Sequence, residues 1–548
     1  MTMSFTPEEK ALLEKYVTSA EENVFAIHGL SGIVGAVYAR YSRAKGGFRE
    51  TLLKEFLKDG IIDPKHADAL IERVLIAYGD DSVGELEGTH VSFEEISMLA
   101  TKEIEDRRIG GSPIEQSTRY VFYDQKNDKG EWRYLRHSSL IETSSGSEYV
   151  KTMDAIFAIY VGLIEPMKEY FGKMKPLEEA EYDVNGDGKK ERWAELTSEA
   201  EQKAFRMTYN ADLRTKACDV LRSLLPLATL TNVGMFGNGR FFQGVITHLL
   251  STDIPEAITI GESAFKATSQ VIPQYVRRAK RNEYQVETRR AMFALAESLF
   301  GNDLPSTHTN PSVMLMPEDS RDVSTFAAML YPYSNRSLEA VRKFVANASE
   351  EVRMNIAKTY IGKRRTRRDR PGRALEDGYP YTFDLVTNWG VYKDLMRHRM
   401  NTQQRQLFTT KLGFEMPAEI IDAGYESQAK KCVELADKLF DLITTTDKTL
   451  AQYAVLHGHF ARWSLGCNDR EAEHLIELRT TPQGHTNYRK VGQMMHAEIA
   501  KRSPWRAKLF LGFTDHNDYF WARGDAEANQ RVKERKLEEK QSSKTNQP

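Results

Sequence analysis

Apolar side chains recur at helical spacing over most of the chain. Within residues 7–60 a stripe that includes Leu12 and Tyr16 predicts helix. Thr6 followed by Pro7 is a favourable helix start, because threonine can cap the first turn and proline suits the first helical position. The same period predicts helices around residues 148–173, 199–225, 255–300, 335–361 and 426–460.

Strand-like segments are short and few. The clearest are residues 89–93, 119–123 and 381–386, which are rich in β-branched and aromatic side chains. Because helical segments outnumber them, we expect an α+β fold in which helices pack on a small, mostly antiparallel sheet.

The chain is too long for one hydrophobic core. With 548 residues, of which 41% are hydrophobic, it is expected to form two or three domains. Residues 301–312 are polar and contain prolines, as is typical of a linker, so we place domains at residues 1–300 and 313–525. Residues 526–548 are nearly all charged or polar and are predicted to be a tail of frayed helix or disorder.

Charge and cysteine content narrow the classes of function. The 76 Lys and Arg residues nearly balance 78 Asp and Glu residues, so no overall field demands nucleic acid or an anionic membrane as partner. No apolar run reaches the length of about eighteen residues that a membrane helix needs, and the amino terminus does not resemble a signal peptide. The three widely spaced cysteines fit reduced thiols that fill cores. We therefore expect a cytoplasmic globular protein.

Four landmarks occur twice in the chain, in the same order. The pairs are Ser42 and Ser334, Glu85 and Asp377, Arg108 and Arg399, and Asn238 and Asn468. Their separations are 292, 292, 291 and 230 positions. The first three separations are nearly equal, and the fourth is shorter by about sixty positions. This pattern predicts two diverged copies, the first of which carries an insertion at about residues 125–200.

Two polar segments, one from each copy, carry the candidate chemistry. Arg397-His398-Arg399 follows an amphipathic segment, and guanidinium forks near a helix end can bind phosphate, carboxylate, or the carbonyl edges of pyrimidines and flavins. Residues 112–119 can wrap an anion with backbone N–H groups, a hydroxyl and one arginine. Taken alone, Arg397-His398-Arg399 is as consistent with a solvated basic turn as with a binding site. Residues 112–119, taken alone, fit an ordinary capped loop better than an anion-binding loop.

Three other motifs have structural interpretations as well as functional ones. Arg479 ends a predicted helix, where it is either a capping charge or a ligand arginine. Residues 183–188 resemble the first half of a calcium-binding EF-hand, but Ala194 stands where the loop needs an acid, so we interpret them as an acidic surface turn. The basic run 363–368 can contact a polyanion or form a solvated arm. We find no zinc constellation and expect no metal.

Together these motifs resemble the flavin-dependent thymidylate synthases, the ThyX class. That family's pattern is Arg-His-Arg, then a serine after seven residues, with glutamate two before and arginine two after the serine. The second copy keeps Arg397, His398 and Arg399 but has Arg405, Leu407 and Thr409 downstream. The first copy keeps Glu115, Ser117 and Arg119 but has Asp106, Arg107 and Arg108 upstream. Each copy has therefore lost what the other keeps.

The resemblance continues in the later part of each copy, so that it covers roughly residues 30–275 and 325–510. The first copy has Arg222 before Leu225-Pro226, then Asn238-x-Arg240, and Leu249 in place of the last family arginine. The second copy has Gln452, then Asn468-x-Arg470, and keeps Arg479. The departures include Gln483 and Leu86, which stand where family members have histidine.

Family members are homotetramers whose sites lie between subunits. The resemblance therefore implies that the two copies pack as two subunits do and share one composite site. The second such site would be vestigial, and a homodimer of this chain would mimic the tetramer.

The resemblance implies reductive methylation of dUMP to dTMP, with methylenetetrahydrofolate as carbon donor and FAD carrying hydride from NADPH. The catalytic residues implied are Arg397, Ser117 and Arg119. The substrate-binding residues implied are Glu115, Ser117, Arg119, Arg222, Arg397 and Arg479. The cofactor-binding residues implied are Ser42, Ser82, Glu85, Asn238, Arg240, Ser334, His398, Arg399, Asn468 and Arg470.

Two other classes of function stay open at this point. A non-catalytic scaffold would bind flavin or nucleotide without turnover, which the loss of motif parts in both copies favours. A nucleic-acid-binding protein would use residues 363–368, but the balanced charge of the chain argues against an extended basic face.

Overall fold

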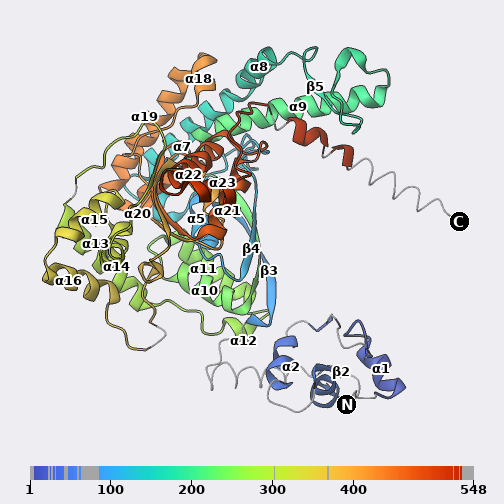
Figure 1. The fold of residues 1–548 in the computed structure, drawn as a ribbon, viewed down its shortest axis with the longest axis vertical. Helices are drawn as coiled ribbons and strands as arrows, with labels where there is room; N and C mark the ends of the chain where they lie inside the picture. Colours follow the sequence, from blue (N-terminus) through green and yellow to red (C-terminus); the bar gives the residue numbers. More distant parts are fainter. Residues whose placement is uncertain are drawn as a thin grey trace. The chain divides into compact units, whose positions relative to one another are not determined.

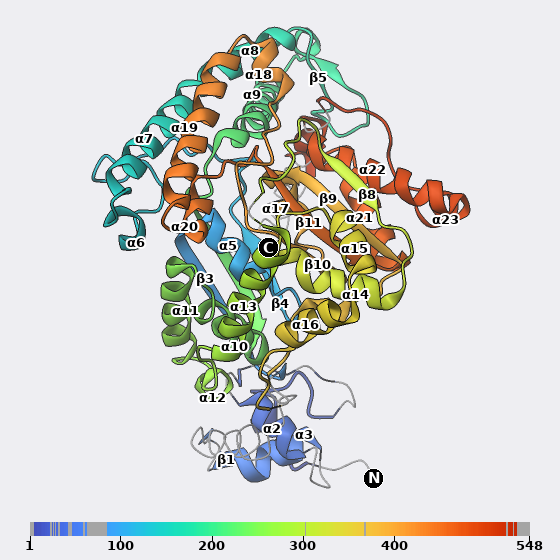
Figure 2. The same ribbon diagram turned by 90° about the vertical axis from the view of Figure 1, so that its left-hand side faces the viewer.

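The computed structural model divides into two compact units (Figures 1 and 2). Unit 1 comprises residues 1–96, 100–115 and 231–286, and unit 2 comprises residues 97–99, 116–230 and 287–548. Unit 2 thus contains segments of both predicted copies. The structure describes residues 5–21, 25, 27, 29–30, 33–41, 47–58, 61–62, 85–301, 303–366, 369–521, 524–529 and 531–533.

Unit 1 is built around a three-stranded sheet with strand order β3-β7-β4. Strands β4 and β7 are antiparallel, with Glu115 opposite Val233. Helices α10 and α11 pack against each other after β7. The elements are α1 (Pro7–Leu13), α2 (Val34–Tyr41), α3 (Phe48–Thr51), the π-helical η1 (Leu52–Phe56), β1 (Leu57–Lys58), β2 (Ile61–Ile62), β3 (Gly88–Ser97), α5 (Met98–Glu105), β4 (Gly111–Glu115), β7 (Leu230–Asn238), α10 (Gly239–Leu250), α11 (Pro255–Thr268) and α12 (Pro273–Val276).

The larger unit 2 has a four-stranded antiparallel sheet, ordered β10-β11-β9-β8, as its centre. Its central strands are buried almost throughout: β11 is mostly apolar, whereas β9 alternates apolar residues with the buried polar residues Asp384, Thr387 and Asn388. The first half of this unit contains α6 (Ser138–Ile141), α7 (Gly146–Gly162), α8 (Ile164–Met174), β5 (Glu181–Tyr182), β6 (Glu191–Arg192), η4 (Trp193–Glu195), α9 (Glu199–Leu221), η5 (Arg222–Leu224) and most of α13 (Glu283–Phe300).

The second half of unit 2 runs from β8 to α23. It contains β8 (Ser312–Leu315), α14 (Arg321–Leu330), η6 (Tyr331–Tyr333), α15 (Leu338–Asn347), α16 (Glu350–Ile361), η7 (Arg373–Glu376), β9 (Tyr381–Asn388), α17 (Trp389–Leu395), β10 (Thr402–Arg405), α18 (Ala418–Asp422), α19 (Glu426–Thr444), α20 (Lys448–Ala451), η8 (Gln452–Ala454), β11 (Phe460–Cys467), α21 (Asp469–Thr480), α22 (Thr486–Arg502) and α23 (Pro504–Phe510). Helix α22 packs on β8, and α21 packs on β11.

The mixed helical and antiparallel architecture agrees with the expected α+β class. Residues 89–93 lie in β3 and residues 381–386 lie in β9, as predicted. Residues 119–123 do not form the predicted strand. The backbone N–H groups of Tyr120 and Val121 both donate to the carbonyl of Ser117, which closes a turn there.

The amino-terminal helix prediction is confirmed at its start and wrong in its length. Thr6 caps α1 in a capping box with Glu9. Helix α1 ends at Leu13, and Val17 forms an isolated β-bridge with Ile27, so the described part of residues 7–60 contains several short elements rather than long helices.

Backbone pairing around Pro226 and Leu456 joins the two predicted copies within unit 2. The N–H of Leu227 donates to the carbonyl of Val455 over 2.8 Å, and the N–H of His457 donates to that of Leu225 over 2.9 Å. These two bonds flank the antiparallel bridge between Pro226 and Leu456. Positions 226 and 456 are 230 apart, the separation of the two Asn-x-Arg motifs. Equivalent residues therefore face each other, as at a two-fold interface.

A second pair of backbone contacts repeats at the same separations. Met98 and Leu99 donate from N–H to the carbonyls of Thr229 and Leu227, over 2.9 and 3.1 Å. The counterparts 291 positions later, Trp389 and Gly390, donate to those of His459 and His457, over 2.9 and 3.1 Å. The backbone hydrogen bonds therefore recur at the separations of the predicted repeat.

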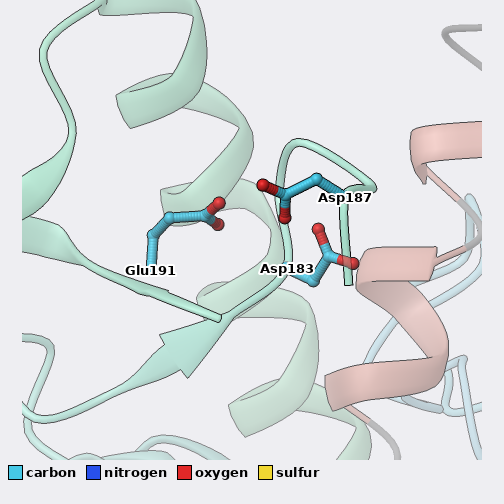
Figure 3. Close-up of side chains that lie close together, drawn as sticks. All are labelled: Asp183, Asp187 and Glu191. Carbon is cyan, nitrogen blue, oxygen red and sulfur yellow. The ribbon is translucent and has the colours of Figure 1, made fainter. Parts of the chain in front are cut away.

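The predicted insertion contributes helices to one end of unit 2. Helix α7 packs on α19, and α8 packs on α9, side by side in both views (Figures 1 and 2). In the hairpin β5–β6 the carboxylates of Asp183, Asp187 and Glu191 converge, with one oxygen of each within 4.8 Å of the others (Figure 3). The N–H groups of Gly186 and Gly188 donate to Asp183, so the carboxylate holds the acidic turn that the sequence indicates.

The cysteines are core residues. Cys218, Cys432 and Cys467 are buried and free, as predicted. Burial raises the pKa of the Cys218 thiol to about 12, which keeps it protonated and unreactive near neutral pH.

None of the helices in the described ranges combines the length and the apolar character needed to span a bilayer.

Candidate functional site

The candidate site lies in unit 2, where α9 of the first predicted copy ends beside α17, α21 and α22 of the second. Arg119 follows the turn at Ser117, whose hydroxyl oxygen accepts a hydrogen bond from the N–H of Arg119 over 3.2 Å. Its guanidinium forms a bidentate pair with Asp219 on α9: Nε donates to Oδ1 over 2.7 Å and Nη2 donates to Oδ2 over 2.8 Å. Both side chains are largely buried. These two parallel hydrogen bonds fix the plane of the Arg119 guanidinium group.

Arg222 directly follows α9 and reaches the second copy. Its side chain is buried, and Nη1 and Nη2 lie 3.3 and 3.4 Å from Oδ2 of Asp394 on α17. Gly390 makes room for it, because a Cβ at that position would lie 3.3 Å from Nη2 of Arg222. This ion pair therefore connects the two copies directly.

The Arg-His-Arg segment follows α17, as the sequence predicts. His398 is buried, with Nδ1 3.1 Å from Oε1 of Glu471 and Nε2 2.9 Å from Nε of Arg479. Because Nε of an arginine only donates, Nε2 of His398 is the acceptor and Nδ1 carries the proton that Glu471 accepts. Burial and the neighbouring Arg479 lower the pKa of His398, although Glu471 opposes them, so the ring stays neutral and holds Arg479.

The carboxylates of Asp394 and Asp219 stay ionised inside this arrangement. Burial opposes ionisation of Asp394, but Arg222, Arg397 and Arg479 outweigh it and hold its pKa well below the usual range. Burial likewise opposes ionisation of Asp219, and Arg119 is the main charge that lowers its pKa.

We call this group the arginine cluster; its members are Arg119, Arg222, Arg397 and Arg479 with the carboxylates Asp219 and Asp394. These members are four cations and two anions, and the buried Lys393 is a further cation that lowers the pKa of Asp394, so positive charge exceeds negative charge here. The adjacent His485 adds none, because burial and the nearby Arg222 lower its pKa to about 3. Such a cluster can bind a dianion.

The predicted residues divide into those that lie in the cluster and those that do not. Arg119, Arg222, Arg397 and Arg479 come together, and Ser117 forms the turn that presents Arg119. Glu115 lies in unit 1, where its buried carboxylate is 3.1 Å from Nζ of the buried Lys102.

The predicted flavin residues have local partners. In unit 1, Asn238 caps α10 and Arg240 pairs with Glu85. In unit 2, Asn468 caps α21, Arg470 pairs with Glu473 over 2.5 Å, Ser334 donates to the carbonyl of Tyr331 over 3.1 Å, and Arg399 is exposed. Ser42 and Ser82 lie outside the described residues.

Sequence reasoning missed Asp219, Asp394, His485 and Tyr488. Asp219-x-x-Arg222 and Asp394-x-x-Arg397 share one spacing, which is a signal that a search for paired charges would have found. His485 and Tyr488 give no comparable signal, because an isolated histidine or tyrosine is common at a helix start.

The fold and this site together define an α+β protein with a buried cluster of arginines and carboxylates. The family model described as thymidylate synthase complementing protein matches residues 33–274 and 313–505. The chain therefore belongs to that family.

Named relatives match over nearly their whole length. The UPF0159 protein of Chlamydia pneumoniae is 36% identical over 537 residues, which cover 94% of this chain and 96% of that protein. The UPF0159 protein of Chlamydia muridarum is 34% identical over 535 residues, with the same coverage. The UPF0159 protein Ta1429 of Thermoplasma acidophilum is 28% identical over 505 residues, 91% of this chain and 98% of that protein.

Proposed function

We propose that this chain is a FAD-dependent thymidylate synthase, which methylates dUMP reductively to dTMP with methylenetetrahydrofolate as carbon donor and NADPH as reductant. The arginine cluster is the observation that carries the proposal. Its excess of positive charge suits the phosphate of a nucleoside monophosphate, which carries close to two negative charges near pH 7. Family membership supports the reaction class.

The chain would act as two tandem copies that share one site. The repeated backbone contacts around Pro226 and Leu456 support packing of the copies as in a two-fold dimer. At the positions equivalent to Arg119 and Arg222 the second copy has Thr409 and Gln452, and Gln452 is satisfied locally by the N–H of Phe408, 3.0 Å away. One nucleotide site per chain follows, and two chains would form the dimer that mimics the family's tetramer.

In this proposal each side chain acts by charge and position. Arg397 would polarise the uracil ring, and Arg119, Arg222 and Arg479 would hold the phosphate and base, with Ser117 presenting Arg119. The guanidinium groups of Arg240, Arg399 and Arg470 and the amides of Asn238 and Asn468 have donor chemistry that fits FAD's pyrophosphate and ring carbonyls. FAD when bound would supply hydride transfer.

A second function, a scaffold that binds nucleotide without turnover, is favoured by one observation. Asp219 and Asp394 already neutralise part of the cluster. An anion site that is pre-organised in this way can bind a nucleotide without catalysing a reaction of it.

Titration of dUMP into the FAD-loaded protein tests the proposal. Perturbation of the flavin's visible bands is expected in the wild type, and its loss is expected in Arg119→Met and Arg397→Met, which remove one arginine from each copy. Arg342→Met is the matched control for Arg119→Met, because Arg342 is about as buried as Arg119 and lies 3.4 Å from its partner Asp319, outside the cluster.

Formation of dTMP from dUMP, methylenetetrahydrofolate and NADPH would then separate the enzyme from the scaffold. A protein that responds to dUMP but forms no dTMP would support the scaffold. A protein that takes up no FAD and binds no dUMP would contradict both.

A further inference from the structure

Tyr488, near the start of α22, stands between two arginines that come from different copies. The guanidinium carbon of Arg119 lies 5.8 Å from the centre of the Tyr488 ring, and that of Arg479 lies 5.5 Å from it. Nη1 of Arg119 also donates to the Tyr488 hydroxyl over 3.3 Å. Tyr488 is only 8% exposed, so these contacts are shielded from water.

The Tyr488 ring offsets the repulsion between two positive charges in the arginine cluster. Two guanidinium groups that converge on one ligand repel each other while the ligand is absent. An aromatic ring attracts both of them through its quadrupole and adds no net charge. Tyr488 therefore holds Arg119 and Arg479 near each other without neutralising either.

The position of Tyr488 is set by the residues just before it. His485 caps α22: its Nδ1 accepts from the N–H of Asn487, so Nε2 carries the proton and donates to the carbonyl of Asp219 over 3.2 Å. Gly484 lets the ring pack closely, because a Cβ there would lie 2.7 Å from a carbon of the Tyr488 ring. The first turn of α22 is thus tied to the end of α9, next to the partner of Arg119.

We infer that Tyr488 is a positioning residue of the composite site, which sets the spacing of Arg119 and Arg479 and so the fit of the nucleotide's phosphate. The inference rests on the proposed function, because it takes a nucleoside monophosphate as the ligand. Tyr488 has no place in the family pattern that the sequence resembles; its role comes from its contacts.

Binding of dUMP and of deoxyuridine, measured by calorimetry on the full chain, tests the inference. Tyr488→Leu removes both ring contacts, and about a ten-fold loss of dUMP affinity is expected from two cation–π contacts. Affinity for deoxyuridine, which lacks the phosphate, should not change. Tyr488→Phe keeps the ring and should restore most of the dUMP affinity.

The matched control is Tyr519→Leu. Tyr519 makes the same kind of contact, with the guanidinium of Arg489 at 4.9 Å from its ring, but it does not touch the arginine cluster. This variant should bind both ligands like the wild type. In a double-mutant cycle, Tyr488→Leu should cost much less affinity in an Arg119→Met background than in the wild type.

Several outcomes would overturn the inference. The first is a dUMP affinity that does not change in Tyr488→Leu. The second is an equal loss of affinity for dUMP and for deoxyuridine, and the third is additive effects of the two substitutions in the double-mutant cycle. If the Leu variant fails to fold, Tyr488→Met takes its place, and thermal midpoints are measured for every variant. A wild-type chain that does not bind dUMP at all contradicts the proposed function instead, which is a distinct result.

Discussion

Asp219 and Asp394 lie near the ends of α9 and α17, and each precedes by three positions an arginine just beyond its helix, yet each pairs with an arginine from another segment. Asp219 holds Arg119, and Asp394 holds Arg222. Local spacing brings a carboxylate and an arginine to one helix face, but only the meeting of four segments decides which pairs form. Each carboxylate balances the positive charge of a buried guanidinium group. Removal of either partner would therefore leave a buried charge without a counter-ion.

The neutral state of His485 predicts a pH dependence of stability. Its pKa is about 3 in the folded protein, from burial first and the nearby Arg222 second, against an ordinary value of 6.5. As pH falls below 6.5, His485 therefore becomes protonated in the unfolded chain but stays neutral in the folded chain. The free energy of unfolding should fall by up to about 1.4 kcal/mol per pH unit from this group alone, until about pH 3.

Urea denaturation at pH 7, 6 and 5 measures this effect against His485→Gln, which cannot titrate. The stability of the variant should fall less steeply with decreasing pH. The lowered carboxylate pKa values of Asp219 and Asp394 act in a separate window, below about pH 4. Equal slopes for the two proteins between pH 7 and 5 would contradict a neutral, buried His485.

At the scale of elements, the site is an assembly of helix ends. Arg222, Arg397 and Arg479 lie at or just beyond the C-terminal ends of α9, α17 and α21. Helix C-termini carry partial negative charge, which favours cations there. Three helices that converge in this way place arginines close together while their dipoles offset part of the mutual repulsion.

Gly484 is the point at which the start of α22 depends most on close packing. In Gly484→Ala the new Cβ would lie 2.7 Å from the Tyr488 ring, 2.9 Å from Cγ of Arg489 and 3.0 Å from the carbonyl oxygen of Thr481. A destabilisation of about 1–3 kcal/mol is expected, as for overpacking elsewhere, with weaker dUMP binding.

Chemical denaturation of both alanine variants checks this prediction. Gly162→Ala is the control, because nothing lies within 4 Å of the added Cβ at the end of α7. That variant should be neutral or more stable by a few tenths of a kcal/mol, up to about 1 kcal/mol. Equal stabilities of the two variants would show that α22 shifts freely, and would remove the packing role of Gly484.

At the scale of the whole molecule, the two predicted copies share backbone contacts but differ in the side chains that they contribute to the site. Backbone contacts recur at separations of 291 and 230, but Arg119, Arg222 and Arg479 have Thr409, Gln452 and Leu249 at the corresponding positions. A symmetric dimer needs both of its sites to come from one sequence, whereas a tandem chain can keep each half of a motif in only one copy. This freedom is the physical reason that each copy can lose what the other keeps.

The proposed single composite site per chain predicts the binding stoichiometry. Calorimetric titration with dUMP should saturate at one nucleotide per chain, because Thr409, Gln452 and Leu249 stand at the equivalents of three cluster arginines. Sedimentation of the same sample should give a dimer of chains. Two nucleotides per chain would contradict the loss of the second site, and a stable monomer that binds dUMP would contradict the proposed dimer.

The sequence by itself determined most of the helical segments beyond residue 60, the strands at residues 89–93 and 381–386, and the arginines that meet in the site. Those features depend on local periodicity, on residue type and on separations along the chain, all of which are visible without coordinates. It did not determine that residues 119–123 form a turn, that Glu115 pairs with Lys102, or that His398 holds Arg479.

Only the tertiary structure decided which charges pair and which residues space them. Asp219, Asp394, His485 and Tyr488 act through partners that are far away along the chain, from 100 positions for Asp219 with Arg119 to 369 for Tyr488 with Arg119. Such contacts depend on how α9, α17, α21 and α22 pack together, and helix packing is set by complementary surfaces that no local pattern specifies.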